Sequence, residues 1–164
     1  MAASREALAT TLGPDHPAID AIAAAKALVH LGFQEQLIGA PVDRGDPRLH
    51  AYLRAKLLHP SQECLFAIFM DRGGRYLGGE IASIGDANRL QVSVRSIVHR
   101  ALDTEASAIL LAHNHPSGDC NPSPRDITET RRLASILAAI DLALVDHLIV
   151  SSNGVFSLEK GKQL

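Results

Sequence analysis

The 164-residue sequence has no tryptophan, only two cysteines and few aromatic residues, which make up 4% of the chain. Cys64 and Cys120 are too few for the disulfide framework of a small secreted protein, and free thiols fit a reducing compartment. No apolar run approaches the roughly 20 residues that a membrane-spanning helix needs. The N-terminal stretch MAASREALATTLG lacks the apolar centre of a signal peptide. We therefore expect a cytoplasmic protein without a membrane anchor.

The sequence also lacks a surplus of basic residues. Its formal net charge is −2 at pH 7, whereas nucleic-acid-binding domains usually carry a basic stripe or patch. The short basic clusters at Arg131-Arg132 and at Lys160 and Lys162 are typical of solvated faces. The charge balance therefore argues against nucleic acid as a partner.

The chain does have the composition of a globular protein. Hydrophobic residues make up 46% and charged residues 21% of it, both near the averages for globular domains. A chain of this length is expected to fold as one domain and to bury about two-thirds of its extended-chain surface. We expect an N-terminal helical extension over residues 1–47, followed by the domain proper over residues 48–164.

Hydrophobic periodicity and turn residues predict a mixed α/β order for this domain. Residues 1–13 show no regular pattern and are expected to be frayed. The predicted elements are a helix from about Asp15 that Gly32 would end, a helix over 48–60, strands over 64–70 and 75–84, a helix over about 93–103, a strand over 107–114, a helix that begins at Ser123-Pro124, and strands over 144–152 and 155–160. This order predicts a mixed β-sheet with helices packed on it.

The most distinctive stretch is LLAHNHPSGDCNPSPRD, residues 110–126. His113 and His115 lie two positions apart at the end of a predicted strand, so both imidazoles face one side if the strand is extended. Neutral imidazole is a common metal ligand, and an open zinc site needs a third protein ligand. Asp126 is the candidate, because the Pro/Gly-rich loop reverses the chain beside the strand end. Such a site would be hydrolytic, since zinc lowers the pKa of bound water to about 7.

The same residues have structural interpretations. A histidine at a strand end is usually structural or exposed, and Asp126, three residues after Ser123, fits a helix capping box. His147, in the strand DHLIV, is open between an orienting role and an ordinary strand position. Two histidines and a carboxylate also form the facial triad of iron oxygenases.

The spacing H-N-H, then seven residues, then S-x-x-D resembles the signature of the JAMM (MPN/JAB) metalloproteases. The flanking segments VSVRSIVHRAL and DHLIVSSNGVFSLEKG resemble the RadC-like branch of that superfamily, over about residues 48–160. The resemblance implies a single α/β domain with a JAMM/MPN-type mixed sheet flanked by helices, an architecture similar to that of cytidine deaminases.

The resemblance also implies a site and a reaction. It implies one Zn²⁺ per chain on His113, His115 and Asp126, and Ser123 as a group that stabilises an oxyanion. It implies a zinc-dependent hydrolase of peptide or isopeptide bonds, a metallopeptidase that uses a metal-activated water.

The family's remaining element is a glutamate that takes a proton from the metal-bound water. Glu63, at the head of CLFAIFM, matches its position upstream of the histidines, and Glu80 is the alternative. A solvated charge at a strand end is the structural interpretation of Glu63.

Two alternatives without hydrolysis stay open, a DNA-repair-associated accessory protein and a protein-interaction module. RadC-like proteins commonly carry an N-terminal helix-hairpin-helix segment that binds DNA, but residues 1–47 look too short for one and lack its G-x-G hairpin. The sequence leaves the physiological substrate and the oligomeric state open.

Overall fold

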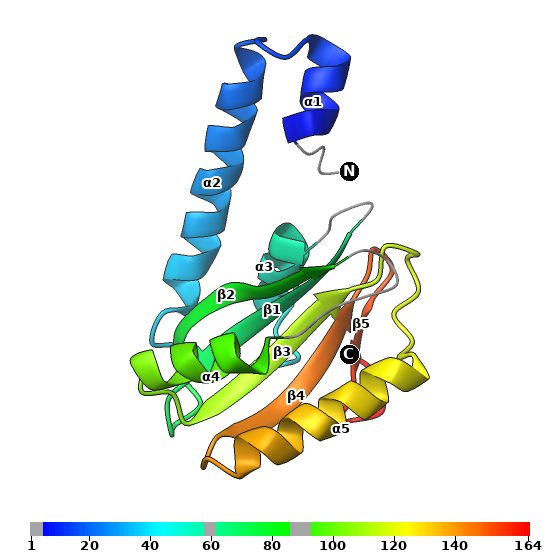
Figure 1. Cartoon of the computed structure of the whole chain (residues 1–164). Coiled ribbons are helices and arrows are strands. Elements are labelled where there is room, and N and C mark those ends of the chain that lie inside the picture. The colour runs from blue at the N-terminus through cyan, green and yellow to red at the C-terminus, as the bar shows by residue number, and fades with distance from the viewer. Residues whose placement is uncertain (1–4, 58–61, 86–92) are drawn as a thin grey trace.

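A six-stranded mixed sheet forms the centre of the computed structural model, which describes residues 5–57, 62–85 and 93–164 (Figure 1). The strand order is β2-β1-β3-β4-β5-β6. The elements are α1 (Arg5–Leu12), α2 (Ala18–Leu37), α3 (Pro47–Leu57), β1 (Glu63–Met70), β2 (Tyr76–Gly85), α4 (Val94–Asp103), β3 (Ala108–Asn114), α5 (Pro124–Ala138), β4 (Ala143–Val150), β5 (Val155–Ser157) and β6 (Lys162–Gln163). The predicted mixed sheet flanked by helices is confirmed.

The strand directions follow from the connections. β1 pairs antiparallel with β2 and with β3, whereas β3 and β4 are parallel and are joined through α5. A parallel pair needs such a crossover, because a tight turn cannot return the chain to the same end of the sheet. β4, β5 and β6 then form an antiparallel edge.

Helices cover both faces of the central strands, which explains why β1 is an unbroken apolar run. Phe66 and Ile68 pack on the α3 side with Leu53, whereas Leu65 and Phe69 pack on the side of α4 and α5. Burying each such side chain contributes about 1.5–3 kcal/mol. Figure 1 shows α4 and α5 on one face of the sheet and α3 on the other.

Two expectations for the N-terminal region are wrong. Residues 5–12 form α1 instead of a frayed segment, and α2 continues through Gly32 to Leu37. A glycine inside a helix costs only about 1 kcal/mol, which the alanine-rich sequence before it and the good helix formers after it can offset. The helix ends before Gly39, whose φ of +70° is the left-handed conformation that glycine adopts readily.

Smaller differences lie at element ends. α3 starts at Pro47, and its predicted end at Pro60 falls outside the described residues. The predicted strand over 155–160 is shorter, and β6 follows it after a turn. Within the described ranges, no helix combines the length and the hydropathy that a membrane crossing requires.

Candidate metal centre

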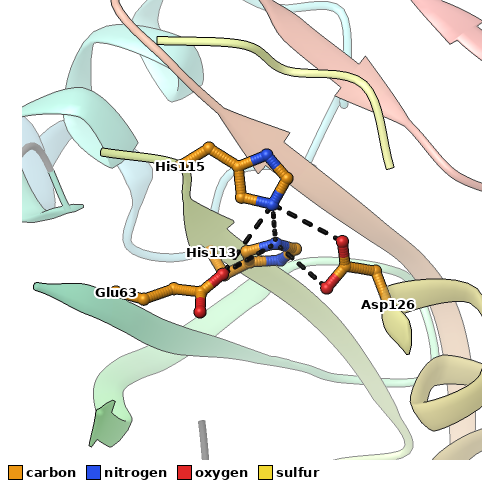
Figure 2. Close-up of side chains that lie close together, drawn as sticks. All are labelled: Glu63, His113, His115 and Asp126. Carbon is orange, nitrogen blue, oxygen red and sulfur yellow. Dashed lines mark hydrogen bonds and ion pairs between the residues drawn. The ribbon is translucent and has the colours of Figure 1, made fainter. Parts of the chain in front are cut away.

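Four side chains converge where β1 begins and β3 ends (Figure 2). They are Glu63, His113, His115 and Asp126, and one ligand-type atom from each lies within 4.8 Å of the others. Glu63 opens β1 and His113 lies near the end of β3, so the antiparallel register, in which Leu65 faces His113, brings them together.

The two imidazoles point their Nε2 atoms into this cluster. The Nε2 atoms of His113 and His115 lie 2.9 Å apart, and each is 3.7 Å from Oε1 of Glu63. The carboxylate of Asp126 lies 3.5 Å from His113 Nε2 through Oδ1 and 3.4 Å from His115 Nε2 through Oδ2. His115 Nδ1 donates to the Asp119 carbonyl at 2.8 Å, so Nε2 of the neutral ring carries a lone pair, whereas in the protonated ring Nε2 donates to Asp126.

This donor set fits a zinc ion. Two imidazole nitrogens and a carboxylate oxygen are typical zinc ligands, whereas Mg²⁺ and Ca²⁺ prefer oxygen alone. Ligand atoms about 2.0–2.1 Å from a tetrahedral zinc ion lie about 3.4 Å apart. Asp126 Oδ1 lies 3.5 Å from His113 Nε2 and Asp126 Oδ2 lies 3.4 Å from His115 Nε2, close to that spacing, whereas the two Nε2 atoms, 2.9 Å apart, would have to separate by a few tenths of an ångström to bind one ion. The cluster can therefore hold a metal ion, and its two imidazole nitrogens disfavour Mg²⁺ and Ca²⁺.

Asp126 is both a helix cap and a member of the cluster. Its Oδ2 accepts hydrogen bonds from the Ser123 backbone N–H at 2.8 Å and from the Ser123 hydroxyl at 2.7 Å. Its own N–H donates to Ser123 Oγ at 3.2 Å, which completes the capping box. The two interpretations of Asp126 are therefore compatible, because the cap holds the carboxylate toward the histidines.

Burial and neighbouring charges shift the pKa values of Glu63 and Asp126 in opposite directions. Burial raises the pKa of Glu63, and the Asp126 carboxylate adds to that increase while His115 opposes it. Burial would also raise the pKa of Asp126, but hydrogen bonding to His115, the nearby His113 and the bonds from Ser123 outweigh it and hold this pKa below its usual range. Asp126 thus stays ionised, as a ligand must, and Glu63 binds a proton more readily.

The structure brings Glu63, and not Glu80, to the histidines. Glu80 lies on β2, and its Oε2 is 3.4 Å from Nε of Arg100 on α4. It lines a separate surface hollow with Arg95 and His99.

Three further residues support the cluster, and among them only His147 was open to an orienting role from the sequence. His147 Nε2 lies 2.8 Å from His113 Nδ1, and Thr130 Oγ1 lies 2.6 Å from His147 Nδ1. Burial lowers the pKa of His147 to about 4, so its ring is neutral. Asn114, between the two histidines, bonds to the backbone on both sides of Glu63. No local pattern predicted the roles of Thr130 and Asn114, because their partners are distant in sequence.

The cluster lies in a cavity of about 340 Å³. Leu65, Leu111 and Leu133 give it an apolar side, and Arg125 and Arg132 are charged groups among its lining. Ser123 lines the cavity as well. A ligand in this space would meet the metal-binding side chains and an apolar surface together.

Comparison with known proteins agrees with this geometry. The family model described as a RadC-like JAB domain matches residues 45–164. The chain is 37% identical over 116 residues to a UPF0758 protein of Cupriavidus pinatubonensis, covering 71% of this chain and 51% of that protein. It is 41% identical over 107 residues to a UPF0758 protein of Pseudomonas entomophila, covering 65% of this chain and 47% of that protein.

The chain spans about half the length of the curated relatives that it matches. The boundary expected between residues 47 and 48 stays a prediction. The resemblance stated from the motif is confirmed over nearly the same residues, 45–164. The chain belongs to the family of proteins with a RadC-like JAB domain.

Proposed function

We propose that this protein is a metal-dependent hydrolase with one zinc ion per chain, held by His113, His115 and Asp126. The observation that carries the proposal is the convergence of these groups and Glu63 within 4.8 Å, in a cavity large enough for part of a substrate. Zinc in such a centre lowers the pKa of a bound water to about 7 and polarises a carbonyl oxygen.

Glu63 is the proposed general base. Its Oε1 lies at equal distances of 3.7 Å from the two imidazole Nε2 atoms, and burial raises its pKa. A carboxylate in this position can take a proton from water at Oε1 and return it to the leaving amine. Glu63 could instead be a fourth ligand, and the two roles differ in whether Glu63→Gln keeps the metal.

Ser123 is the proposed donor to an oxyanion that forms on the substrate carbonyl. Its hydroxyl donates to Asp126 Oδ2 at 2.7 Å, so it must rotate toward the substrate to serve this role. The backbone N–H of Ser123 also bonds to Asp126 Oδ2 and would keep the carboxylate in place during that rotation.

The proposed substrate is a peptide or isopeptide bond. The apolar side of the cavity, formed by Leu65, Leu111 and Leu133, favours an apolar side chain or an aliphatic lysine stem beside the scissile amide. No nucleic acid is proposed as a partner, because the net charge of −2 gives no electrostatic basis for binding it.

Metal content is the first test. Wild-type protein and His115→Ala are dialysed against a weak chelator and analysed by mass spectrometry. About one zinc per chain in the wild type, lost in the variant, is the expected result. No metal in either protein would leave Asp126 as a helix cap alone and would favour a protein-interaction module. Iron in place of zinc would favour oxygenase chemistry.

Hydrolysis is the second test, with Glu63→Gln and Glu80→Gln as a matched pair. Peptide and isopeptide libraries are screened for cleavage by the zinc-loaded proteins. Glu63→Gln is expected to keep its zinc and to lose about 10²–10⁴-fold in turnover, the usual contribution of a general base. Glu80→Gln is expected to match the wild type, since Glu80 pairs with Arg100 outside the cluster. Equal turnover in all three proteins would reject Glu63 as the base.

A further inference from the structure

A chain of hydrogen-bonded side chains runs from α5 to the metal centre. Thr130 Oγ1 lies 2.6 Å from His147 Nδ1, and His147 Nε2 lies 2.8 Å from His113 Nδ1. The other nitrogen of His113, Nε2, belongs to the four-residue cluster. Both ring nitrogens of His147 thus have a partner, and the positions of the protons decide which atoms donate.

Two proton arrangements satisfy this Thr130–His147–His113 chain. In the first, the Thr130 hydroxyl donates to His147 Nδ1, and His147 Nε2–H donates to His113 Nδ1. His113 Nε2–H then donates to the lone pair that neutral His115 carries on Nε2, 2.9 Å away. In the second, His113 Nδ1–H donates to His147 Nε2, and His147 Nδ1–H donates to the Thr130 oxygen. A mixed arrangement would set two N–H groups or two lone pairs against each other, because neutral imidazole has one of each.

Only the second arrangement leaves a lone pair on His113 Nε2, which a metal ion needs. We propose that His147 and Thr130 are positioning residues that hold His113 in its metal-binding tautomer, and that zinc binding reverses the direction of donation along the chain. This inference rests on the metal centre proposed above. The rings can keep their orientations, because only protons change place.

The residue types in the Thr130–His147–His113 chain allow the direction of hydrogen-bond donation to reverse. A hydroxyl donates and accepts through one oxygen, so Thr130 can end the chain in both arrangements. A carboxylate or a backbone carbonyl could end only the second, since each can only accept. His113 and His147 are 2% and 7% exposed, so the surrounding protein leaves little room for water to replace a missing partner.

The Thr130–His147–His113 hydrogen bonds also link α5 to the metal centre a second time, besides the link through Asp126. Asp126 lies in the first turn of α5, and Thr130 lies four residues later on the same face of the helix. The helix therefore orients Asp126 directly and His113 through His147. Partners of metal-binding histidines typically change metal affinity by about 10–100-fold when they are removed.

The first test measures the tautomers in wild-type protein by long-range ¹H–¹⁵N correlation spectra. Metal-stripped protein is expected to carry the His147 proton on Nε2, and zinc-loaded protein to carry it on Nδ1. His113 is expected to change from Nε2–H to Nδ1–H on loading. The same His147 tautomer in both samples would overturn the reversal.

The second test measures zinc affinity by competition with a chromophoric chelator. His147→Leu is expected to lose about 10–100-fold in affinity. His147→Gln is expected to stay close to the wild type, because its amide can turn either its oxygen or its NH₂ toward His113. Thr130→Val is expected to lose less affinity than His147→Leu, and Thr130→Ser is expected to bind zinc as the wild type does.

The outcomes separate this inference from the proposed function. A wild type that binds no zinc would overturn both. A wild type that binds zinc, with unchanged affinity in folded His147→Leu and in Thr130→Val, would overturn the positioning role alone. If His147→Leu fails to fold, the Thr130→Val and Thr130→Ser pair decides, since Thr130 is only partly buried on the helix.

Discussion

The two faces of the sheet bury polar side chains in different ways, and adjacent residues of β4 show the contrast. His147 points to the α5 face and bonds to the ring of a proposed metal ligand. Asp146 points to the α3 face, with 0% of its side chain exposed, and stabilises the fold itself. It accepts bonds from the N–H groups of His147 and Glu159 at 2.7 and 3.0 Å, from the Ser157 hydroxyl and from the Arg44 guanidinium.

β3 repeats the contrast one strand away. His113 points to the α5 face, and the next residue, Asn114, points to the α3 face. The Asn114 side chain accepts from the Cys64 N–H at 2.7 Å and donates to the Gln62 carbonyl at 2.9 Å. These two backbone groups flank Glu63, so the fold-stabilising face also holds the start of β1 in place.

Burial alone therefore does not identify a functional polar group in this protein. Throughout the described residues, every buried side-chain nitrogen or oxygen has a hydrogen-bond partner. The difference lies in where each network ends, at backbone groups and Arg44 on one face and at the cavity on the other. Substitutions on the α3 face should change the free energy of unfolding, and those on the α5 face should change zinc affinity.

Asp146→Ala should give the largest effect on stability. The change leaves two backbone N–H groups and the Ser157 hydroxyl without their acceptor, and it breaks a partly buried ion pair with Arg44. The free energy of unfolding is expected to fall by about 3–5 kcal/mol, measured by urea denaturation. The protein that remains folded should bind zinc as the wild type does. A loss of zinc affinity without a loss of stability would reject the contrast between the two faces.

Much of the central fold could be predicted from local sequence. The apolar runs at β1 and β3 and the Ser123-Pro124 helix start are local signals, and the structure has these elements within one or two residues of their predicted positions. The His-x-His spacing predicted a shared direction for two imidazoles, which holds because His113 lies one residue before the end of β3 and His115 follows the strand directly.

The features that could not be predicted from the sequence depend on pairing between distant segments. The proximity of Glu63 to His113 follows from the β1–β3 register across 50 positions, and no local pattern separates Glu63 from Glu80. Asp146 looks like an ordinary charged residue until Arg44, 102 positions away, and Ser157 come beside it. Sequence patterns indicate which residues belong to an element more readily than which element lies beside it.

Ser157→Ala and Thr130→Val form a matched pair, since each removes one hydroxyl from one network. The Ser157 hydroxyl donates to the Asp146 carboxylate, so its loss should cost about 1.5–3 kcal/mol of unfolding free energy and leave zinc affinity unchanged. Thr130→Val should lower zinc affinity and change stability less, because Thr130 bonds to a neutral ring. Urea denaturation and chelator competition on both variants test this. If the two variants changed unfolding free energy and zinc affinity to the same extent, the proposed difference between the two networks would be wrong.

Asn114→Ala should cost about 1–3 kcal/mol, because it leaves the Cys64 N–H without its acceptor. Glu63, next to that N–H, should then be held less firmly, so turnover of the zinc-loaded protein should fall. Zinc content should stay near that of the wild type, since Asn114 faces away from the imidazoles. The measurements are turnover and metal content on the same preparation. Lost zinc with normal turnover per bound zinc would place Asn114 with the ligands instead.

Ser123→Ala should give the smallest change in stability, about 0.5–2 kcal/mol for a lost helix cap. The variant tests a residue that belongs both to the residues that stabilise the fold and to those that affect zinc binding. Ser123 caps α5 and also bonds to Asp126, so the change should lower stability and zinc affinity together. The affinity loss should be modest, because the Ser123 backbone N–H still bonds to Asp126 Oδ2.

Turnover adds a third measurement for this residue. An oxyanion donor is worth about 10²–10³-fold, so Ser123→Ala should lose far more turnover than its stability or zinc affinity accounts for. Ser123→Thr keeps both the hydroxyl and the cap and should recover most of the loss. If turnover per bound zinc were unchanged in Ser123→Ala, Ser123 would serve only to hold α5 and Asp126. It would then belong with Asp146 and Asn114 among the residues that stabilise the fold around the site.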